Sequence, residues 1–385
     1  MAKADFTAAE FAGRQARLRA ALAAAGLDGL IVIHPASIHW LTGSEAKSYQ
    51  EFQCLLVSAT AGPVAALVRA GEVAELEADS IVPEVVGWGG GVAEDPIAAL
   101  AALARRHGLV GRRIGLEVPA YYLHPYHHAA LLELFGAARM VDATRLIGDL
   151  RLVKSPAEIG YIREAAALAD LGMAEFRRRL RAGVSELELA GHVTGALLTQ
   201  GSGIAASPIN LVSGPRAAFS HGAPTRRRLA PGDTGTIEFG ATAARYTATI
   251  GRHFVLGPPS PRVLELYDVV RRAADAMLAA IRPGVPAVAV HEAATAVIAA
   301  AGLDRHRVHL SGYGIGPSFA PSWAEPLLLF DASPHVLEAG MVVTVEPPVF
   351  IAAAGLGARL IDNVVVTETG AELLARDARG LIVAA

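Results

Sequence analysis

The N-terminal part of the chain alternates between short apolar runs and longer stretches whose apolar residues recur at helical spacing. A helical stretch at residues 7–25 precedes an apolar run at residues 30–33, which is typical of a buried strand. Further strands are predicted at residues 54–58, 64–68, 81–86 and 113–117, and further helices at residues 97–108 and 126–135. Because strands alternate with helices, we predict an α/β domain, which we place at residues 1–148.

A pattern of paired helices occurs twice in the remaining residues, 149–385. Ser155 with Glu158, and Ser185 with Glu188, have the spacing of capping boxes and mark the start of two helices. Another pair of helices is predicted at residues 263–281 and 287–301. The helices of each pair are joined by the same Arg-x-Gly-Val sequence, at residues 181–184 and 282–285. This duplication predicts an α+β domain of two related halves that enclose a cleft.

Two alternating runs, at residues 236–239 and 245–256, flank a turn of small residues and predict an antiparallel hairpin. If the turn is centred on Ala243 and Ala244, Glu238 lies opposite Thr249. A carboxylate in the middle of a strand with apolar neighbours needs a partner if it is buried. The alternative is an edge-strand glutamate that faces water.

Composition limits the class of protein. A chain of 385 residues with 52% hydrophobic and 18% charged residues can bury a large core in two domains. The net charge of −3 gives no reason to expect nucleic-acid binding. The single cysteine excludes an internal disulfide and a cysteine-based zinc site. We see neither a signal peptide nor an apolar run of membrane-spanning length, and we expect a cytoplasmic protein that takes a small-molecule substrate.

Four further segments carry a resemblance to a known family: SGPRAAFSHG at 213–222, VHLSGYGIGPSFAPSWAEP at 308–326, LEAGMVVTVEPPVF at 337–350 and GARLIDNVVVTETG at 357–370. With the hairpin, they resemble the creatinase, aminopeptidase P and prolidase superfamily. The resemblance implies a creatinase-type N-terminal domain and a pita-bread C-terminal domain, with two halves of helices and antiparallel sheet related by a pseudo-twofold axis. It also implies a homodimer.

The same resemblance shows where this chain departs from the family. The family holds two divalent ions with two Asp, one His and two Glu, and the matching positions here are Glu238, Thr249, Tyr313, Glu346 and Ile361. Both bridging positions have lost their carboxylates. Asp362 is adjacent, but the two-residue period of a strand points it to the other face. We therefore expect no cofactor and no metal site, although a single divalent ion held by Glu238, His309 and Glu346 stays an alternative.

The motif positions give a set of candidate site residues. The resemblance implies catalytic roles for His221, Glu238, His309, Tyr313 and Glu346. We expect substrate contacts from Tyr246, Phe319, Trp323, Glu325 and Arg359. Two neighbouring carboxylates raise the pKa of one of them, which suits proton transfer near neutral pH.

The departures favour one function and leave two alternatives. The pattern around Tyr313 and Trp323 resembles that of ectoine hydrolase, a relative that opens a cyclic amidine. The first hypothesis is a metal-independent hydrolase of a C–N bond in a small amidine, cyclic amide or N-acyl substrate. The second is a metal-dependent Xaa-Pro dipeptidase or aminopeptidase. The third is a non-catalytic homologue that binds a ligand in the cleft.

Overall fold

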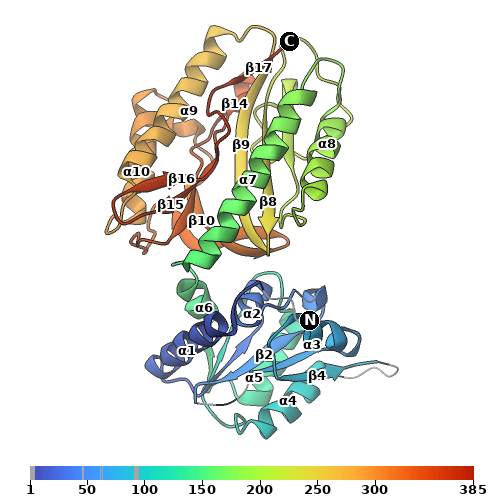
Figure 1. Ribbon diagram of the computed structural model, residues 1–385. Helices are drawn as coiled ribbons and strands as arrows, with labels where there is room; N and C mark the ends of the chain where they lie inside the picture. Colours follow the sequence, from blue (N-terminus) through green and yellow to red (C-terminus); the bar gives the residue numbers. More distant parts are fainter. Residues whose placement is uncertain (1–4, 46, 61, 63, 91–94) are drawn as a thin grey trace. The chain divides into compact units, whose positions relative to one another are not determined.

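The computed structural model describes residues 5–45, 47–60, 62, 64–90 and 95–385. The chain forms two compact units, Met1–Arg151 and Leu152–Ala385 (Figure 1).

The first unit is built on a six-stranded mixed sheet with the order β4-β3-β2-β1-β5-β6. Strand β1 pairs antiparallel with β2 and parallel with β5. The strands are β1 (Gly29–Val32), β2 (Cys54–Ser58), β3 (Ala65–Arg69), β4 (Glu84–Trp88), β5 (Ile114–Leu116) and β6 (Met140–Asp142). The predicted α/β class is therefore observed, with one strand displaced: β4 begins three residues after the predicted start of 81, beyond Pro83.

Helices cover the sheet of the first unit and give it two apolar cores. The helices are α1 (Ala8–Ala24), α2 (Pro35–Thr42), α3 (Val73–Asp79), α4 (Pro96–Arg106), α5 (Pro125–Phe135) and α6 (Thr144–Leu150), with short 3₁₀ turns η1 (Lys47–Gln50) and η2 (Ala70–Glu72). One core joins α1 to the sheet through Leu18 and Leu22, and the other joins α4 and α5 to it through Leu100 and Leu131. Cys54 is buried in the second core.

The second unit contains the two predicted helix pairs. They are α7 (Pro156–Arg179) with α8 (Glu186–Thr199), and α9 (Pro261–Ala280) with α10 (Ala287–Ala300). Both predicted capping boxes are present, because Ser155 and Ser185 each accept a hydrogen bond from the backbone of the glutamate three residues later. In Figure 1, α7 crosses the long strands β8 and β9, and α9 and α10 lie together on the other half.

The two halves repeat each other in detail. Gly183 and Gly284 stand at equivalent turns, and both have a φ of +83°, a left-handed conformation that favours glycine. The backbone N–H of Gly183 donates to Leu229, and that of Gly284 donates to Leu337, both at 2.8 Å. Matching turns with matching partners confirm the duplicated pita-bread architecture.

A nine-stranded sheet forms the centre of the second unit, with the order β16-β15-β12-β10-β9-β8-β7, while β11 pairs with β10 and β17 with β9. The strands are β7 (Asn210–Ser213), β8 (Thr234–Ala243), β9 (Tyr246–Leu256), β10 (Gly312–Phe319), β11 (Ser322–Leu329), β12 (Val342–Val345), β15 (Asp362–Val366), β16 (Ala371–Leu373) and β17 (Ile382–Ala384). Strands β13 (Val349–Ile351) and β14 (Leu356–Ala358) form a separate hairpin. Short 3₁₀ turns lie at η3 (Gly214–Arg216), η4 (Asp304–His306) and η5 (Ala352–Ala354).

The register of the central hairpin differs from the prediction. Ala244 and Arg245 form the turn, so Glu238 pairs with Gly251, and Thr249 pairs with Gly240. Both turn residues have positive φ, at 46° and 66°. The expected pairing of Glu238 with Thr249 is therefore wrong by two residues.

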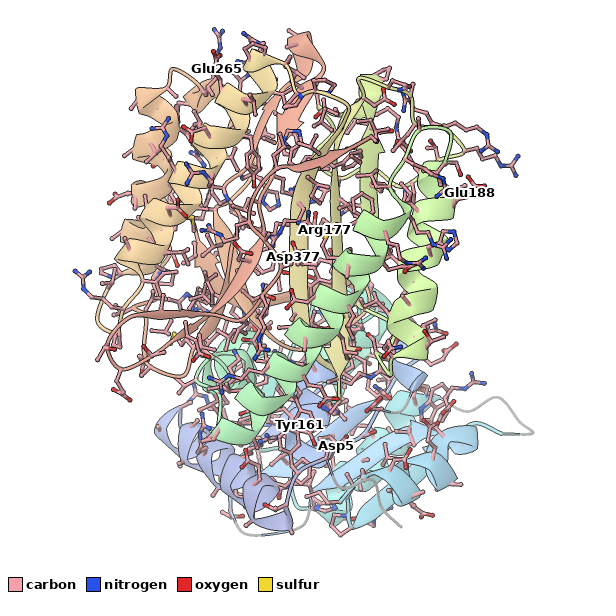
Figure 2. All side chains as sticks on the ribbon, turned by 45° about the horizontal axis from the view of Figure 1, so that its top comes forward. Asp5, Tyr161, Arg177, Glu188, Glu265 and Asp377 are labelled. Atoms are coloured by element: carbon pink, nitrogen blue, oxygen red, sulfur yellow. The ribbon has the colours of Figure 1, made fainter. Side chains whose placement is uncertain are left out.

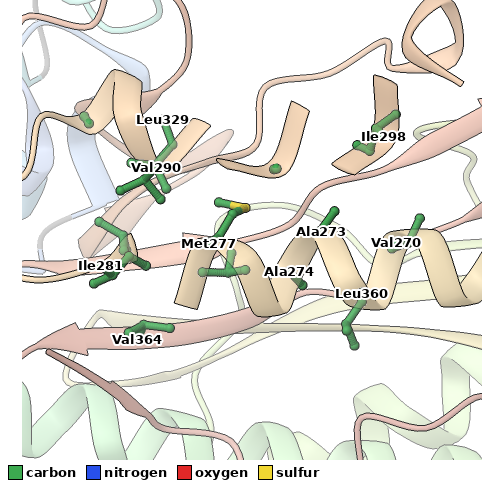
Figure 3. Close-up of a cluster of buried hydrophobic side chains, with 14 of the residues drawn as sticks. Val270, Ala273, Ala274, Met277, Ile281, Val290, Ile298, Leu329, Leu360 and Val364 are labelled. Atoms are coloured by element: carbon green, nitrogen blue, oxygen red, sulfur yellow. The ribbon is translucent and has the colours of Figure 1, made fainter. Parts of the chain in front are cut away.

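Separate apolar cores hold the helices of each half against the sheet. Phe176 of α7 and Phe254 of β9 meet edge-on, with ring centroids 5.4 Å apart. In the other half, α9 contributes Met277 and Val270 to a cluster that Figure 3 shows beside Leu360 and Val364. Ionic contacts add to the packing, as between Arg177 and Asp377, whose charged atoms are 2.9 Å apart (Figure 2). Within the described residues, no helix combines the length and apolar character needed to cross a bilayer.

Candidate active site

The carboxylate of Glu238 is buried in the middle of β8, with 4% of the residue exposed. It forms an ion pair with Arg359, and it accepts a hydrogen bond of 3.2 Å from the side-chain amide of Asn210 on β7. The prediction that a buried carboxylate on this strand needs a partner is met by these two contacts. A water-facing edge position is excluded, because β8 lies between β7 and β9.

Arg359 follows β14 and is 2% exposed. Its guanidinium also lies 3.3 Å from the hydroxyl of Ser220 and 5.5 Å from the centroid of the Phe350 ring. Among the described residues, the Nε of Arg359 has no hydrogen-bond partner. Arg359 is thus the buried cation of the site, and it compensates the charge of Glu238.

Two histidines lie side by side next to this pair. The ring centroids of His221 and His309 are 5.2 Å apart. Burial and the positive charge of Arg359 lower the pKa of both imidazoles from the usual value of 6.5. Both rings are therefore neutral at pH 7. The Nδ1 of His309 lies 3.0 Å from the carbonyl oxygen of Leu310 and 3.4 Å from Oε1 of Glu346. Two acceptors at Nδ1 place the proton there and leave Nε2 as a base.

Glu346 follows strand β12 and is 3% exposed. Burial first, and then the nearby charge of Glu238, raise the pKa of its carboxyl to about 8. Hydrogen bonds from Tyr313 and Thr344 act in the opposite direction. Within the described residues, Oε2 of Glu346 is buried without a hydrogen-bond partner. At pH 7 this carboxyl is mostly protonated and can donate a proton.

Tyr313 completes the cluster from β10. Its hydroxyl oxygen accepts a hydrogen bond of 2.8 Å from the indole Nε1 of Trp323 on β11. Burial raises the pKa of the Tyr313 hydroxyl well above its usual value, so the group remains a donor. The hydroxyl can stabilise negative charge that develops beside it.

The residues at the two positions of the lost bridging carboxylates make structural contacts instead. The hydroxyl of Thr249 accepts a 3.0 Å hydrogen bond from the amide of Asn363, and the side chain of Ile361 fills the space over Gly251. Asp362 points to the other face, as the strand period predicts, with Oδ1 3.0 Å from Arg252 and Oδ2 2.7 Å from Arg379. It cannot replace the missing bridging ligand from there.

Three of the expected substrate contacts have other partners. The hydroxyl of Tyr246 donates a 2.7 Å hydrogen bond to Glu158 of α7. Glu325 forms a fully buried ion pair with Lys154. Phe319 is 1% exposed and lies under the guanidinium of Arg245, 4.6 Å from its ring centroid. Because burial and these contacts occupy them, we no longer expect Tyr246, Phe319 and Glu325 to contact substrate. Trp323 contacts Tyr313, and Arg359 contacts Glu238.

The structure thus gathers His221, Glu238, His309, Tyr313 and Glu346 around Arg359, in the second unit of a two-domain pita-bread hydrolase. Residues 160–368 match the model of Metallopeptidase family M24, and residues 14–153 match that of the Creatinase/Prolidase N-terminal domain. The chain belongs to family M24 and is a hydrolase that acts on C–N bonds.

Similar proteins agree with this family over nearly the whole chain. The chain is 32% identical over 375 residues to the "Probable dipeptidase PepE" of Mycobacterium tuberculosis, covering 96% of each chain. It is 30% identical to the solved Dipeptidase PepE from Mycobacterium ulcerans, with a TM-score of 0.85 over 98% of this chain and 99% of the other. For the solved Xaa-Pro dipeptidase from Bacillus anthracis, the identity is 26%, the TM-score 0.84, and the coverage 97% and 99%.

Membership in a metallopeptidase family contradicts the expectation that this protein has no cofactor. The described side chains, however, do not fit a pair of ions as they stand. Thr249, Tyr313 and Ile361 replace three ligands, and the guanidinium of Arg359 lies against Glu238. Among the described residues, no group of three or more His, Cys, Asp and Glu side chains is placed to hold a metal ion. The proton transfers considered below therefore use only side chains of this chain.

Sequence reasoning missed two contacts of the site. Asn210 lies outside the motifs that suggested candidate residues, although it hydrogen-bonds to Glu238. Thr344 lies within the motif at 337–350 but was not chosen as a candidate, although its hydrogen bond lowers the pKa of Glu346. Asn210 opens the strand that precedes SGPRAAFSHG, and Thr344 lies two residues before Glu346. The two-residue period of a strand was the signal that could have paired Thr344 with Glu346.

Proposed function

We propose that the protein hydrolyses the amide bond of short peptides, with Xaa-Pro dipeptides as the first class to test. One observation carries the proposal: Nδ1 of His309 and Oε1 of Glu346 lie 3.4 Å apart, where burial lowers the pKa of the imidazole and raises the pKa of the carboxyl to about 8. A base and an acid side by side are what amide hydrolysis requires, because water loses a proton while the leaving nitrogen gains one. The names of the dipeptidase relatives support the peptide class.

The proton balance assigns a role to each group. Water attacks the carbonyl carbon and gives its proton to Nε2 of His309. Glu346 gives its proton to the amide nitrogen as the C–N bond breaks, which releases an acid and an amine. Nδ1–H of His309 then gives its proton to Glu346 across 3.4 Å, and exchange of the Nε2 proton with solvent water returns the ring to the tautomer protonated at Nδ1 before the next turnover. The hydroxyl of Tyr313, which donates to Glu346 in the free enzyme, turns its proton to the oxygen that becomes negative in the transition state.

Glu238 has a different part in this scheme. Its ion pair with Arg359 and the hydrogen bond from Asn210 occupy the carboxylate, so it serves as an anchor for the cation. The two charges cancel, so the ion pair places a guanidinium in the site without adding a net charge to it. The negative field of Glu238 also contributes to the raised pKa of Glu346.

The proposal is tested with the purified full-length chain and a panel of Xaa-Pro dipeptides, other dipeptides, and a cyclic amidine of the ectoine type. Each assay is run with and without added Mn²⁺, Co²⁺ or Zn²⁺, so that a missing ion does not hide activity. We expect dipeptide hydrolysis and a loss of about 10²-fold or more in kcat for Glu346→Gln, the size of a general-acid contribution. Opening of the amidine without peptide cleavage would overturn the proposal, as would tight ligand binding without any turnover.

The proposal includes a homodimer in the cytoplasm, as the resemblance to the family implies. Light scattering of the purified chain at several concentrations measures the oligomeric state. A mass of a single chain at every concentration would remove the homodimer from the proposal.

A further inference from the structure

A loop at residues 213–225, called the His221 loop from here on, follows strand β7 and reaches the candidate active site at two points. The hydroxyl of Ser220 lies 3.3 Å from the guanidinium of Arg359. The ring centroid of His221 lies 5.2 Å from that of His309. The position of the loop therefore determines where Ser220 and His221 lie in the site.

One buried carboxylate binds both ends of this loop. Glu186 is the first residue of α8 and is 0% exposed. It accepts a hydrogen bond of 2.7 Å from the hydroxyl of Ser213, where the loop begins. Where the loop ends, Thr225 donates to the same carboxylate from its backbone N–H at 2.9 Å and from its hydroxyl at 2.7 Å. Arg216, from within the loop, adds an ion pair, so the acceptor sites of the carboxylate are filled.

Two further contacts fix the loop between its ends. The guanidinium of Arg216 donates a 2.7 Å hydrogen bond to the carbonyl oxygen of Ala223, which closes the loop on itself. Ala217 is 0% exposed and packs against β14, where a Cβ on Gly357 would lie 2.5 Å from the carbonyl oxygen of Ala217. The two residues that reach the site thus lie between an anchor on β14 and an anchor on Glu186.

The contacts of Glu186 serve the loop rather than the helix that carries this residue. Burial of a carboxylate costs free energy unless hydrogen bonds and a cation compensate it. Among the described residues, every group that donates to this carboxylate belongs to the His221 loop. The start of α8 is capped separately, because Ser185 and Glu188 form the capping box there. The helix therefore does not need Glu186 to begin, and the effect of this carboxylate falls on the loop.

We propose that Glu186 is a positioning residue, which fixes the His221 loop and thereby holds Ser220 and His221 in the site without touching substrate. Its effect on turnover rests on the proposed peptidase function. Without the carboxylate, the three donor residues of the loop lose their common acceptor, and Ser220 is no longer held beside Arg359. A displacement of about 1 Å in an active site can lower the rate by about 10²-fold, so loosening of the loop lowers kcat.

Hydrogen exchange of the full-length protein, measured by mass spectrometry, tests the anchoring of the loop without any turnover. In Glu186→Gln we expect peptides from residues 213–225 to exchange about 10- to 100-fold faster than in the wild type, the value of hydrogen bonds to a charged group, while α9 and α10 exchange as before. The matched control is Glu188→Gln, which changes an exposed glutamate of the same helix and leaves exchange of the loop unchanged (Figure 2).

Thr225→Val removes a single donor and gives a second, milder variant in case Glu186→Gln does not fold. We expect the same peptides to exchange faster in Thr225→Val, by a smaller factor than in Glu186→Gln. Wild-type exchange of residues 213–225 in the folded variants would overturn the inference and leave the proposed function standing.

Steady-state kinetics on a dipeptide give the second readout. We expect kcat of Glu186→Gln to fall by about 10-fold or more with a smaller change in KM, whereas Glu188→Gln keeps the wild-type kcat although it loses its capping box. Faster exchange of the loop with unchanged kcat and KM would overturn the positioning role. A wild type without peptidase activity would overturn the proposed function, and the exchange of residues 213–225 would still decide whether Glu186 fixes the loop.

Discussion

The indole of Trp323 donates a 2.8 Å hydrogen bond to the hydroxyl oxygen of Tyr313. A hydroxyl that accepts this bond keeps its own proton free for a second partner, and Glu346 receives a hydrogen bond from it. Trp323 therefore acts through Tyr313 as a positioning residue. Tyrosine stands here where the resemblance to the metallopeptidases expects a metal-binding histidine.

Replacing Trp323 with Phe removes the donor and keeps most of the ring. Without it, the Tyr313 hydroxyl is free to turn away from Glu346, which then loses a hydrogen bond that lowers its pKa. We expect the alkaline limb of the pH profile of kcat to move to higher pH, since Glu346 acts in its protonated form. The control is Trp88→Phe, which removes an indole hydrogen bond of 2.8 Å to Phe52 in the first unit. An unchanged alkaline limb in Trp323→Phe would refute the positioning role.

We expect the peptidase activity of the wild type to follow a bell-shaped pH profile. The acid limb reflects protonation of His309, whose pKa burial lowers below 6.5, and the alkaline limb reflects ionisation of Glu346, with a pKa of about 8. Activity is therefore highest between these values and falls above pH 8. Steady-state kinetics from pH 4 to pH 10 on one dipeptide measure both limbs. A rate that keeps rising up to pH 10 would contradict the assignment of Glu346 as the acid.

We expect Glu346→Gln to stabilise the fold at alkaline pH although it lowers activity. The carboxyl has a higher pKa in the folded protein than its usual 4.5, so the folded state binds its proton more tightly than the unfolded state. That contribution to stability is present below pH 4.5 and is lost as the pH rises towards about 8. Glutamine carries no charge, so the melting temperature of the variant should exceed that of the wild type at pH 9 and approach it near pH 5.

The matched control for this experiment is Glu368→Gln, which changes an exposed glutamate. Its melting temperature should follow that of the wild type at both pH values. A wild-type protein at least as stable as Glu346→Gln at pH 9 would show that the ionised carboxylate of Glu346 does not destabilise the folded state.

Arg359→Met leaves Glu238 as a buried charge without its cation. Removal of one partner of a buried ion pair costs about 3–5 kcal/mol of unfolding free energy. The double variant Arg359→Met/Glu238→Gln removes both charges and should regain a large part of that loss. Chemical denaturation of the wild type, both single variants and the double variant gives the coupling energy. If the losses of unfolding free energy in the two single variants add up to the loss in the double variant, the coupling energy is zero and the ion pair is not supported.

Sequence alone predicted the features of the fold that depend on residues close to each other along the chain. The capping boxes at Ser155 and Ser185 act within one helical turn, so their spacing was sufficient. The hairpin was predicted, but its register was not. A turn with positive φ at both central residues usually contains glycine or asparagine, and here Ala244 and Arg245 occupy it. Nothing in those two residue types marks the centre of the turn.

The candidate site was predicted as a set of residues but not as a set of contacts. The motifs located Glu238 and Arg359, yet the ion pair between them joins positions 121 residues apart, which no local period reveals. Tyr246 and Glu325 belong to the same motifs and proved to hold α7 and Lys154 instead. Motif membership therefore identified the neighbourhood of the site, and only the packing separated residues that face the reaction from those that support it.

The most direct test of the account is the release of free amino acids from an Xaa-Pro dipeptide by the wild type, His309→Gln and Glu346→Gln, measured side by side at pH 7 with and without added divalent ions. We predict turnover by the wild type and a loss of about 10²-fold or more in each variant. Turnover that survives in both variants, or a wild type that cleaves none of the dipeptides under any of these conditions, would contradict the proposed acid–base pair.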